Sequence, residues 1–131
     1  MDRHWIAIGA LICALGVVAG AFGAHALRAA LESTGDLENW RTAVRYQVWH
    51  GLALVALAPS VTGLGLGRLV LAAFAVGVAL FSGSIFGLSL GGPASVLGPI
   101  TPLGGLLLIG AWLGVARAAL RSPQAAVGGA R

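Results

Sequence analysis

The stretch WIAIGALICALGVVAGAFGAHA, residues 5–26, decides the fold class of this chain. It contains no Asp, Glu, Lys or Arg over its whole length. An α-helix needs an apolar run of about 20 residues to cross the hydrocarbon core of a bilayer. Three further apolar runs follow, and the sequence predicts membrane-crossing helices over about residues 5–31, 42–61, 69–90 and 100–119.

The composition of the whole chain agrees with a membrane location. Of its 131 residues, 58% are hydrophobic and 9% are charged, against about 25% charged in soluble domains. So few charged side chains do not make the polar surface of a soluble domain. We therefore predict an all-α membrane fold, a four-transmembrane-helix antiparallel bundle. One domain covers residues 1–121, and residues 122–131 are predicted to be a flexible C-terminal tail.

The charged residues indicate an orientation in the membrane rather than a nucleic-acid partner. The net charge is +4, and all 8 strongly basic residues are arginines near the ends of the apolar runs. Basic residues concentrate in cytoplasmic loops. With four spans the two termini share one side of the membrane, and this side has more arginines, which predicts that both termini are cytoplasmic. Its arginines are Arg3, Arg68, Arg117, Arg121 and Arg131, whereas the opposite side has Arg28, Arg41 and Arg45.

Polar side chains gather at one depth of the predicted bundle. If the first two helices form a hairpin centred near residue 37, His25 and His50 lie at equal depth, about two turns inside the outer loop. At 100° per residue, the polar residues of each helix also share one face. We predict that a polar pocket opens outward between the first, second and fourth helices. Its predicted residues are His25, Arg28, Glu32, Thr42, Tyr46, Gln47, His50, Ser82, Ser84 and Thr101.

Three interpretations of this polar pocket are open from the residues alone. In the first, its side chains bond one another and fix the helix register, because an ionisable group at membrane depth needs a partner. In the second, the pocket belongs to an oligomeric conduit for small solutes or protons, since histidine titrates near neutral pH. In the third, His25 and His50 bind haem or a metal ion, although a zinc site normally uses more than two protein ligands.

Sequence signatures of soluble-type catalysis do not occur in the chain, so we predict a protein that is not an enzyme and holds no cofactor. We expect an accessory or assembly component of the membrane, or a small-ligand binder that uses the polar pocket. The expected partners are the lipid bilayer and either a larger membrane complex or a second copy of the chain. Such contacts would use glycine-rich helix faces, as in Gly16–Gly20 and Gly83–Gly87, because small residues let membrane helices approach closely.

Four motifs follow one another in an order that resembles a known family. They are GAFGAH (20–25), TAVRYQVWHGLAL (42–54), FSGSIFGLSL (81–90) and ITPLGGLLLIGAWL (100–113). In these motifs the chain resembles the YgdD/YwdK-like family of small bacterial membrane proteins, a domain of unknown function (number 423) to which eukaryotic transmembrane protein 256 is similar. The resemblance implies four membrane helices and a multi-pass location in the bacterial inner (plasma) membrane, with no assigned activity.

Overall fold

The computed structural model describes residues 3–60 and 65–121, and all regular structure in these two ranges is helical. The elements are α1 (Arg3–Ala24), α2 (Arg28–Thr34), α3 (Leu37–Leu57), the 3-10 turn η1 (Ala58–Ser60), α4 (Arg68–Ser89) and α5 (Ala94–Leu120). The predicted all-α fold class is therefore confirmed. The predicted tail, residues 122–131, lies outside the described residues.

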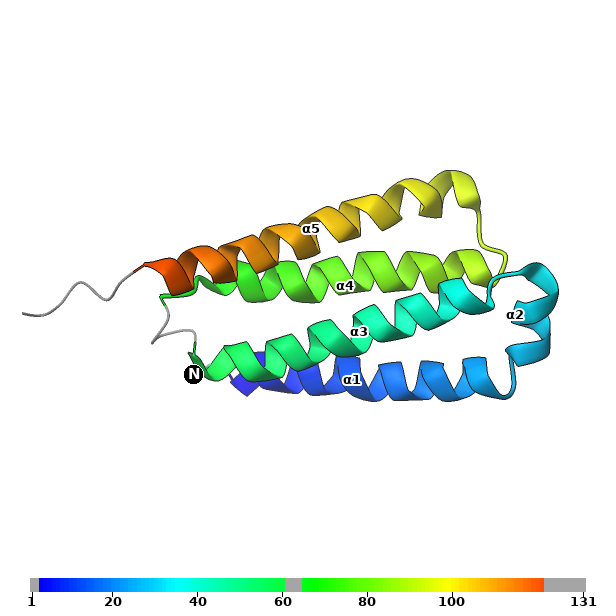
Figure 1. Cartoon of the computed structure of the whole chain (residues 1–131), viewed down its shortest axis with the longest axis horizontal. Coiled ribbons are helices and arrows are strands. Elements are labelled where there is room, and N and C mark those ends of the chain that lie inside the picture. The colour runs from blue at the N-terminus through cyan, green and yellow to red at the C-terminus, as the bar shows by residue number, and fades with distance from the viewer. Residues whose placement is uncertain (1–2, 61–64, 122–131) are drawn as a thin grey trace, which may run out of the picture.

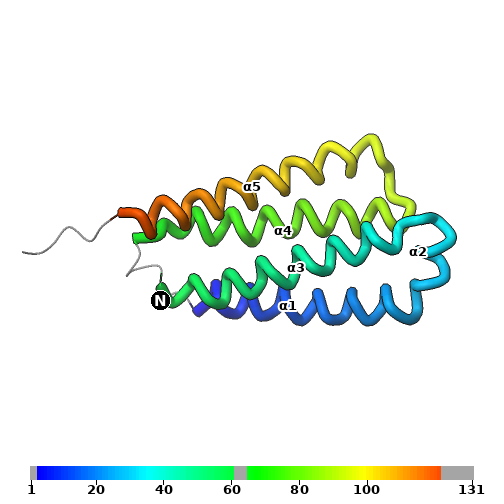
Figure 2. Tube along the Cα trace, viewed as in Figure 1, coloured from blue at the N-terminus to red at the C-terminus, as the bar shows by residue number. Residues whose placement is uncertain are grey.

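The four long helices lie side by side in the order of the chain (Figure 1). Helix α3 packs between α1 and α4, and α5 packs mainly on α4. Consecutive long helices run in opposite directions, so the start of α1 and the end of α5 lie at the same end of the molecule (Figure 2). The short helix α2 lies at the other end, which we call the α2 end. The bundle is antiparallel and open, with α1 and α5 at its two sides.

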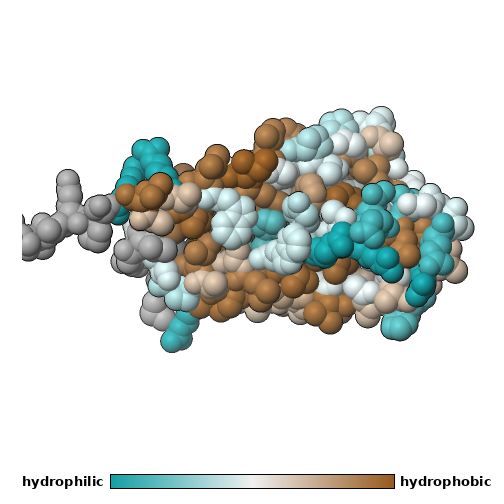
Figure 3. Space-filling model, viewed as in Figure 1, coloured by the Kyte–Doolittle hydropathy of each residue, from teal (hydrophilic) through white to brown (hydrophobic). Residues whose placement is uncertain are grey.

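Three of the long helices, α1, α4 and α5, are long and apolar enough to cross a membrane. Large apolar side chains such as Leu11, Leu69 and Leu106 are more than half exposed on their outer faces. Figure 3 shows hydrophobic residues over most of the visible face, with hydrophilic residues gathered mainly toward the two ends. Helices that are apolar on their exposed faces as well as toward the core are typical of membrane spans.

The first helix is shorter than predicted. It ends at Ala24, so the prediction that it continues to residue 31 is wrong. The chain turns at residues 25–27, where the Leu27 N–H bonds the Phe22 carbonyl at 2.8 Å, and then forms α2. The turn folds Leu31 back over the end of the bundle, where only 2% of its surface is exposed. A straight helix would carry Leu31 past the bundle, and burying a leucine side chain stabilises a fold by about 1.5–3 kcal/mol.

The other predicted bounds differ mainly at helix starts. The prediction for 69–90 agrees with α4 to within one residue. Helix α3 begins at Leu37 rather than near residue 42, because its first turns are polar and hydropathy marks only the apolar part of a helix. Helix α5 begins at Ala94 rather than near residue 100, so Pro99 and Pro102 lie inside it. Membrane helices tolerate proline when neighbouring groups satisfy the freed backbone.

Glycines set the distance between neighbouring helices. A Cβ atom at Gly9 of α1 would lie only 2.7 Å from the Gly51 carbonyl oxygen of α3. A Cβ atom at Gly104 of α5 would lie 2.8 Å from Cα of Phe81 in α4. Both separations are too short for a real side chain, so α1 approaches α3 and α5 approaches α4 at positions where only glycine fits.

Candidate functional site

A recess of about 720 Å³ lies between α3, α4 and α5. We call it the His50 recess. It is lined by Tyr46, Trp49, His50 and Leu52 of α3, Phe81 of α4, and Gly105, Leu108, Ile109 and Trp112 of α5. None of these lining residues is Asp, Glu, Lys or Arg. The volume is within the range of about 300–1,000 Å³ that small-molecule sites occupy.

Histidine 50 is buried in the wall of this recess, with 5% of its surface exposed. Its Nδ1 lies 2.6 Å from the Tyr46 carbonyl oxygen, one turn earlier in α3. Because a carbonyl oxygen only accepts hydrogen bonds, Nδ1 carries the ring proton. The indole N–H of Trp112 donates to Nε2 of His50 at 3.2 Å. Both ring nitrogens are therefore engaged, and the arrangement fits a neutral imidazole in one defined tautomer.

Aromatic rings from three helices surround His50. The ring centroids of Tyr46 and Phe81 are 4.7 Å apart. Those of Phe74 and Trp112 are 5.0 Å apart with an interplanar angle of 78°, and the His50 ring lies 5.9 Å from Phe74. Each such aromatic pair contributes about 0.5–1.5 kcal/mol beyond the burial of its area. These contacts hold α3, α4 and α5 in place around the recess.

Two hydrogen-bonding groups at the recess have no partner among the described residues. They are the Tyr46 hydroxyl and the Trp49 indole N–H, and both side chains line the recess. Trp49 is 55% exposed, and the Tyr46 hydroxyl is not enclosed by protein atoms. In an apolar environment a hydroxyl or indole N–H is stabilised by an acceptor. Two donors without a partner among the described residues thus belong to side chains that line the recess.

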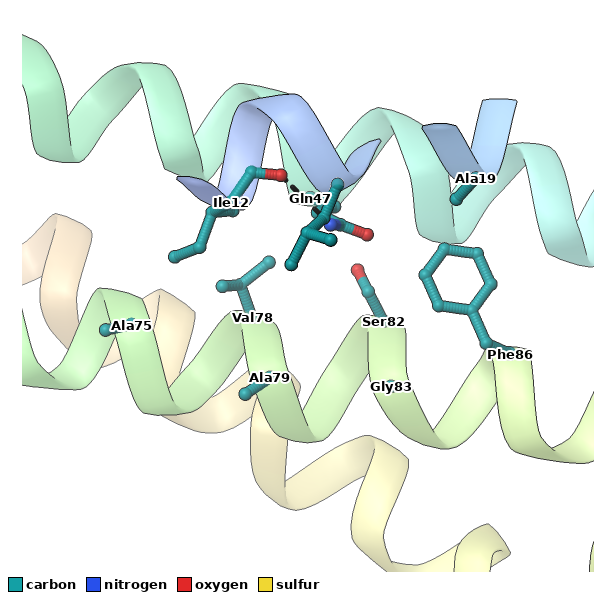
Figure 4. Close-up of a pocket in the computed structure, with 10 residues that line it drawn as sticks. Ile12, Ala19, Gln47, Ala75, Val78, Ala79, Ser82, Gly83 and Phe86 are labelled. Carbon is teal, nitrogen blue, oxygen red and sulfur yellow. Dashed lines mark hydrogen bonds between the residues drawn. The ribbon is translucent and has the colours of Figure 1, made fainter. Parts of the chain in front are cut away.

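A second hollow, of about 380 Å³, lies between α1, α3 and α4. We call it the Gln47 groove. It is lined by Ile12, Leu15, Ala19, Gln47, Ala75, Val78, Ala79, Ser82, Gly83 and Phe86. The Gln47 amide donates to the Ile12 carbonyl of α1 at 3.0 Å, and the Ser82 hydroxyl donates to the Ala43 carbonyl of α3 at 2.8 Å. Figure 4 shows Gln47 and Ser82 pointing toward the same space. Each joins its own helix to a neighbouring helix.

Two further hydroxyls join α4 to α5. The side-chain oxygens of Ser84 and Thr101 lie 2.7 Å apart, and the Thr101 hydroxyl also lies 3.3 Å from the Leu97 carbonyl. The contact between Ser84 and Thr101 lies next to Pro102, which lacks the N–H that would otherwise continue the helical hydrogen bonding. The pair therefore supports the proline-containing part of α5.

The charged residues of the predicted pocket, Arg28 and Glu32, lie at the α2 end and are exposed, and Arg45 and Glu38 form a second ion pair there. Arg28 pairs with Glu32 at 2.9 Å. Arg45 pairs with Glu38 at 2.7 Å and its guanidinium lies 3.1 Å from the Thr42 hydroxyl. The hydrogen bond from Arg45 lowers the pKa of the Glu38 carboxyl below its usual value. Exposed ion pairs of this kind add little to stability.

His25 and His50 do not form a pair, so the predicted juxtaposition is wrong. Gly51, next to His50, packs against Gly9 near the start of α1, whereas His25 is exposed in the turn that follows α1. Along a helix, the sixteen residues from Gly9 to His25 correspond to about 24 Å. The two histidines lie apart because α2 occupies residues 28–34, which shifts the positions that face α3 toward the start of α1. Because the two histidines lie apart, they do not form the predicted haem or metal site.

The predicted pocket residues other than His25 lie in four different places. Arg28, Glu32 and Thr42 lie toward the α2 end; Tyr46 and His50 line the His50 recess; Gln47 and Ser82 line the Gln47 groove; Ser84 and Thr101 join α4 to α5. The prediction of a single pocket between the first, second and fourth helices, which are α1, α3 and α5, is therefore wrong, because α1 and α5 lie at opposite sides of the bundle. Within residues 3–60 and 65–121, no three His, Cys, Asp or Glu side chains come together as a metal site.

Comparison with known proteins identifies the family. Residues 19–105 match the family described as "Protein of unknown function (DUF423)". The chain belongs to this family. It is 38% identical over 122 residues to the UPF0382 membrane protein YwdK of Bacillus subtilis, which covers 91% of this chain and 98% of YwdK. No solved structure matches the chain.

Other relatives of this DUF423 chain extend from bacteria to yeast. The UPF0382 membrane protein SH2409 of Staphylococcus haemolyticus is 40% identical over 113 residues, or 85% of this chain and 90% of the relative. The UPF0382 membrane protein C1782.12c of Schizosaccharomyces pombe is 35% identical over 109 residues, or 80% and 92% of the two chains. The resemblance drawn from the four motifs is confirmed.

Most of the aromatic residues in and around the His50 recess of this DUF423 chain were not predicted from its sequence. Phe74, Phe81 and Trp112 contact the rings of Tyr46 and His50 or each other, but they were not among the predicted site residues. A signal was present, since Phe74 and Phe81 are seven residues apart and thus share one helix face. Trp112 also stands inside the fourth motif. The positions of polar side chains alone do not indicate a site that is built mainly from aromatic rings.

Proposed function

We propose that this chain crosses the membrane four times and binds a small, mostly apolar molecule in the His50 recess. This is a binding function rather than a catalytic one. It retains the expectation of a small-ligand binder from the sequence and moves the site from the predicted polar pocket to the recess between α3, α4 and α5.

The packing of α3 supports the proposal that this helix is the fourth membrane span. It packs between α1 and α4, both of which are long and apolar enough to cross a membrane. The polar groups in its middle face protein, since Gln47 donates to α1 and His50 bonds its own helix and Trp112. Polar side chains in a membrane usually face the bundle interior and have partners there. A helix held in this way crosses at the same depth as its neighbours.

The arginines support cytoplasmic termini for a four-span chain. Among the described residues, Arg3, Arg68, Arg117 and Arg121 belong to the end that holds the start of α1, and Arg28, Arg41 and Arg45 belong to the α2 end. Acidic residues contribute little to orientation, whereas an excess of arginine favours the cytoplasmic side. We therefore place the α2 end outside and, in bacteria, the whole chain in the inner (plasma) membrane.

The composition of the His50 recess carries the proposal of ligand binding. Apolar and aromatic side chains form most of its wall, and Trp49, Leu52 and Ile109 are more than half exposed beside it. In a four-span protein these exposed side chains face lipid, so a molecule dissolved in the bilayer can enter sideways. His50 has both ring nitrogens bonded, which leaves neither one to take a proton from a substrate and favours binding over catalysis.

Gly105 gives a direct test because it lines the recess. A Cβ atom there would lie 3.7 Å from the Phe81 ring, which is an ordinary contact, so the remaining carbons of a leucine can extend into the recess. Gly110 on the same helix is the matched control. A Cβ atom at Gly110 would meet nothing within 4 Å, and Gly110 lines a different hollow, between α4 and α5.

In the test, wild type, Gly105→Leu and Gly110→Leu are purified in a mild detergent, and organic extracts of each are compared by mass spectrometry. We expect one class of membrane-soluble compound at equal molar ratio in wild type and Gly110→Leu. Gly105→Leu should hold at least about tenfold less, since the leucine side chain occupies the part of the recess beside the Phe81 ring. Equal retention by Gly105→Leu, or no retained compound in wild type, would refute the proposal.

A further inference from the structure

The walls of the His50 recess select for a flat, ring-shaped molecule. Five of its lining residues carry planar rings: Tyr46, Trp49, His50, Phe81 and Trp112. Tyr46 lies within ring-contact range of three of the others, at centroid distances of 4.7 Å to Phe81, 5.5 Å to Trp49 and 5.7 Å to His50. Aromatic side chains prefer offset-stacked or edge-to-face contacts with other rings. A flat ring gains such contacts on entering the recess, and a simple acyl chain does not.

The hydrogen-bonding groups of the recess select for acceptors. The Tyr46 hydroxyl and the Trp49 indole N–H have no partner among the described residues, and both can donate. The two nitrogens of His50 are already bonded to Tyr46 and Trp112. Leu108 and the other aliphatic lining residues offer no side-chain hydrogen bond. A complementary ligand therefore presents acceptor atoms at the edge of its ring.

Charge and size narrow the class further. No Asp, Glu, Lys or Arg is among the lining residues, and an uncompensated charge would be strongly disfavoured in such a site, so the ligand is neutral. At about 720 Å³ the recess is larger than a single small ring requires. The aliphatic side chains of Leu52 and Ile109 lie beside it on the exposed side, where an attached hydrocarbon tail can extend into the bilayer.

We propose that the ligand is a lipid quinone, which combines a flat neutral ring, carbonyl acceptors at the ring edge and a long hydrocarbon tail. The proposal rests on the proposed function, since it names the class of molecule that the His50 recess binds. It concerns binding only. The ring lies among the aromatic side chains, its carbonyl oxygens accept from Tyr46 and Trp49, and its tail leaves toward the lipid.

The test compares decylubiquinone, which has a quinone ring and a ten-carbon tail, with decylbenzene, which has the tail and a ring without acceptors. The full chain in detergent micelles is heated at increasing mole fractions of each compound. The rise in unfolding midpoint gives an apparent dissociation constant by linkage. The variants are Tyr46→Phe and Trp49→Phe, with Gly105→Leu to block the recess and Gly110→Leu as the control. Tyr46→Phe removes a hydroxyl that has no partner among the described residues, so we expect the fold to be retained.

We expect decylubiquinone to bind wild type and Gly110→Leu at least tenfold more tightly than decylbenzene. Tyr46→Phe and Trp49→Phe should each weaken decylubiquinone by roughly 2- to 12-fold, the loss of one hydrogen bond, and leave decylbenzene unchanged. If decylbenzene binds wild type as well as the quinone does, and Gly105→Leu binds neither, the quinone assignment fails and the recess stands as a site. If neither compound binds wild type, or both bind Gly105→Leu equally, the quinone assignment and the recess both fail.

Discussion

Replacing Gly104 by alanine tests how closely α4 and α5 must approach. A Cβ atom at Gly104 would lie 2.8 Å from Cα of Phe81 and 2.9 Å from the Gly77 carbonyl oxygen. Both are backbone atoms, so no side-chain rotation relieves the contact. The Phe81 backbone nitrogen is closer still, so the two helices must separate by more than 0.6 Å, the shift that brings the Cβ–Cα distance alone to 3.4 Å, where ordinary contact begins.

The expected loss follows from this separation. Inserting a methyl group into a closely packed contact destabilises a protein by about 1–3 kcal/mol. Alanine also has a higher helix propensity than glycine by about 1 kcal/mol, which offsets part of the loss. Gly110→Ala on the same helix shows that gain alone, because a Cβ atom there meets nothing within 4 Å. We therefore expect Gly104→Ala to be less stable than Gly110→Ala by about 1–3 kcal/mol, or about 5- to 150-fold in the unfolding equilibrium.

Reversible unfolding by sodium dodecyl sulfate in mixed micelles, followed by tryptophan fluorescence, measures this difference. Wild type gives the reference curve, and the two alanine variants are compared at the same detergent composition. Gly104 lies against Phe81, which lines the His50 recess together with Trp49 and Trp112. A shift of α5 relative to α4 should therefore also alter the tryptophan fluorescence of the folded state. Equal unfolding midpoints for the two variants would refute the argument that glycine is required at the crossing.

Three further predictions use the same unfolding assay or a simple cross-link. Trp40→Phe removes the indole N–H that donates to a backbone carbonyl of α1 at 2.8 Å, and should lower stability by about 0.5–1.5 kcal/mol; an unchanged midpoint would contradict this. Cysteines in place of Gly20 and Val44, in a background without the native cysteine, should form a disulfide under mild oxidation, because a Cβ atom at Gly20 would lie 3.4 Å from Cγ1 of Val44. The disulfide is detected as a mobility change on non-reducing gels. If no disulfide forms, the register of α1 against α3 is contradicted. The hydrogen bond from Arg45 lowers the pKa of Glu38, so this pair stabilises the fold above the ordinary carboxyl pKa and the contribution disappears as the pH falls through the lowered value. Because the pair is exposed, Glu38→Gln should be only slightly less stable than wild type at pH 7 and equal to it in strong acid; a gap that persists in strong acid would contradict the assignment.

Hydropathy was sufficient to predict the class of fold and the bounds of α4. The apolar run over 69–90 corresponds to α4 because apolar side chains extend along almost the whole helix and leave a continuous record in the sequence. The break after Ala24 left no such record. It accompanies the burial of Leu31 at the end of the bundle, which is a matter of tertiary packing and not of hydropathy along the chain. The local sequence pattern therefore located the long helices and did not locate the turn after Ala24.

The candidate site was predictable only in part. Tyr46 and His50 were identified as neighbours on one helix face, and they do line one recess. The partner predicted for His50 was another histidine, whereas in the structure it is Trp112 of α5. Which residue of α5 meets α3 depends on how both helices pack on α4, and spacing within a single helix carries no information on that packing.

The order in which the helices pack has a consequence for biogenesis. Because α1 packs mainly on α3, α3 on α4, and α4 on α5, nearly every large contact joins segments that leave the ribosome one after the other. Contacts between consecutive segments close small loops and form early. The α1–α3 hairpin can thus assemble at the translocon before α4 is made, and the His50 recess is the last part to be completed, when α5 arrives.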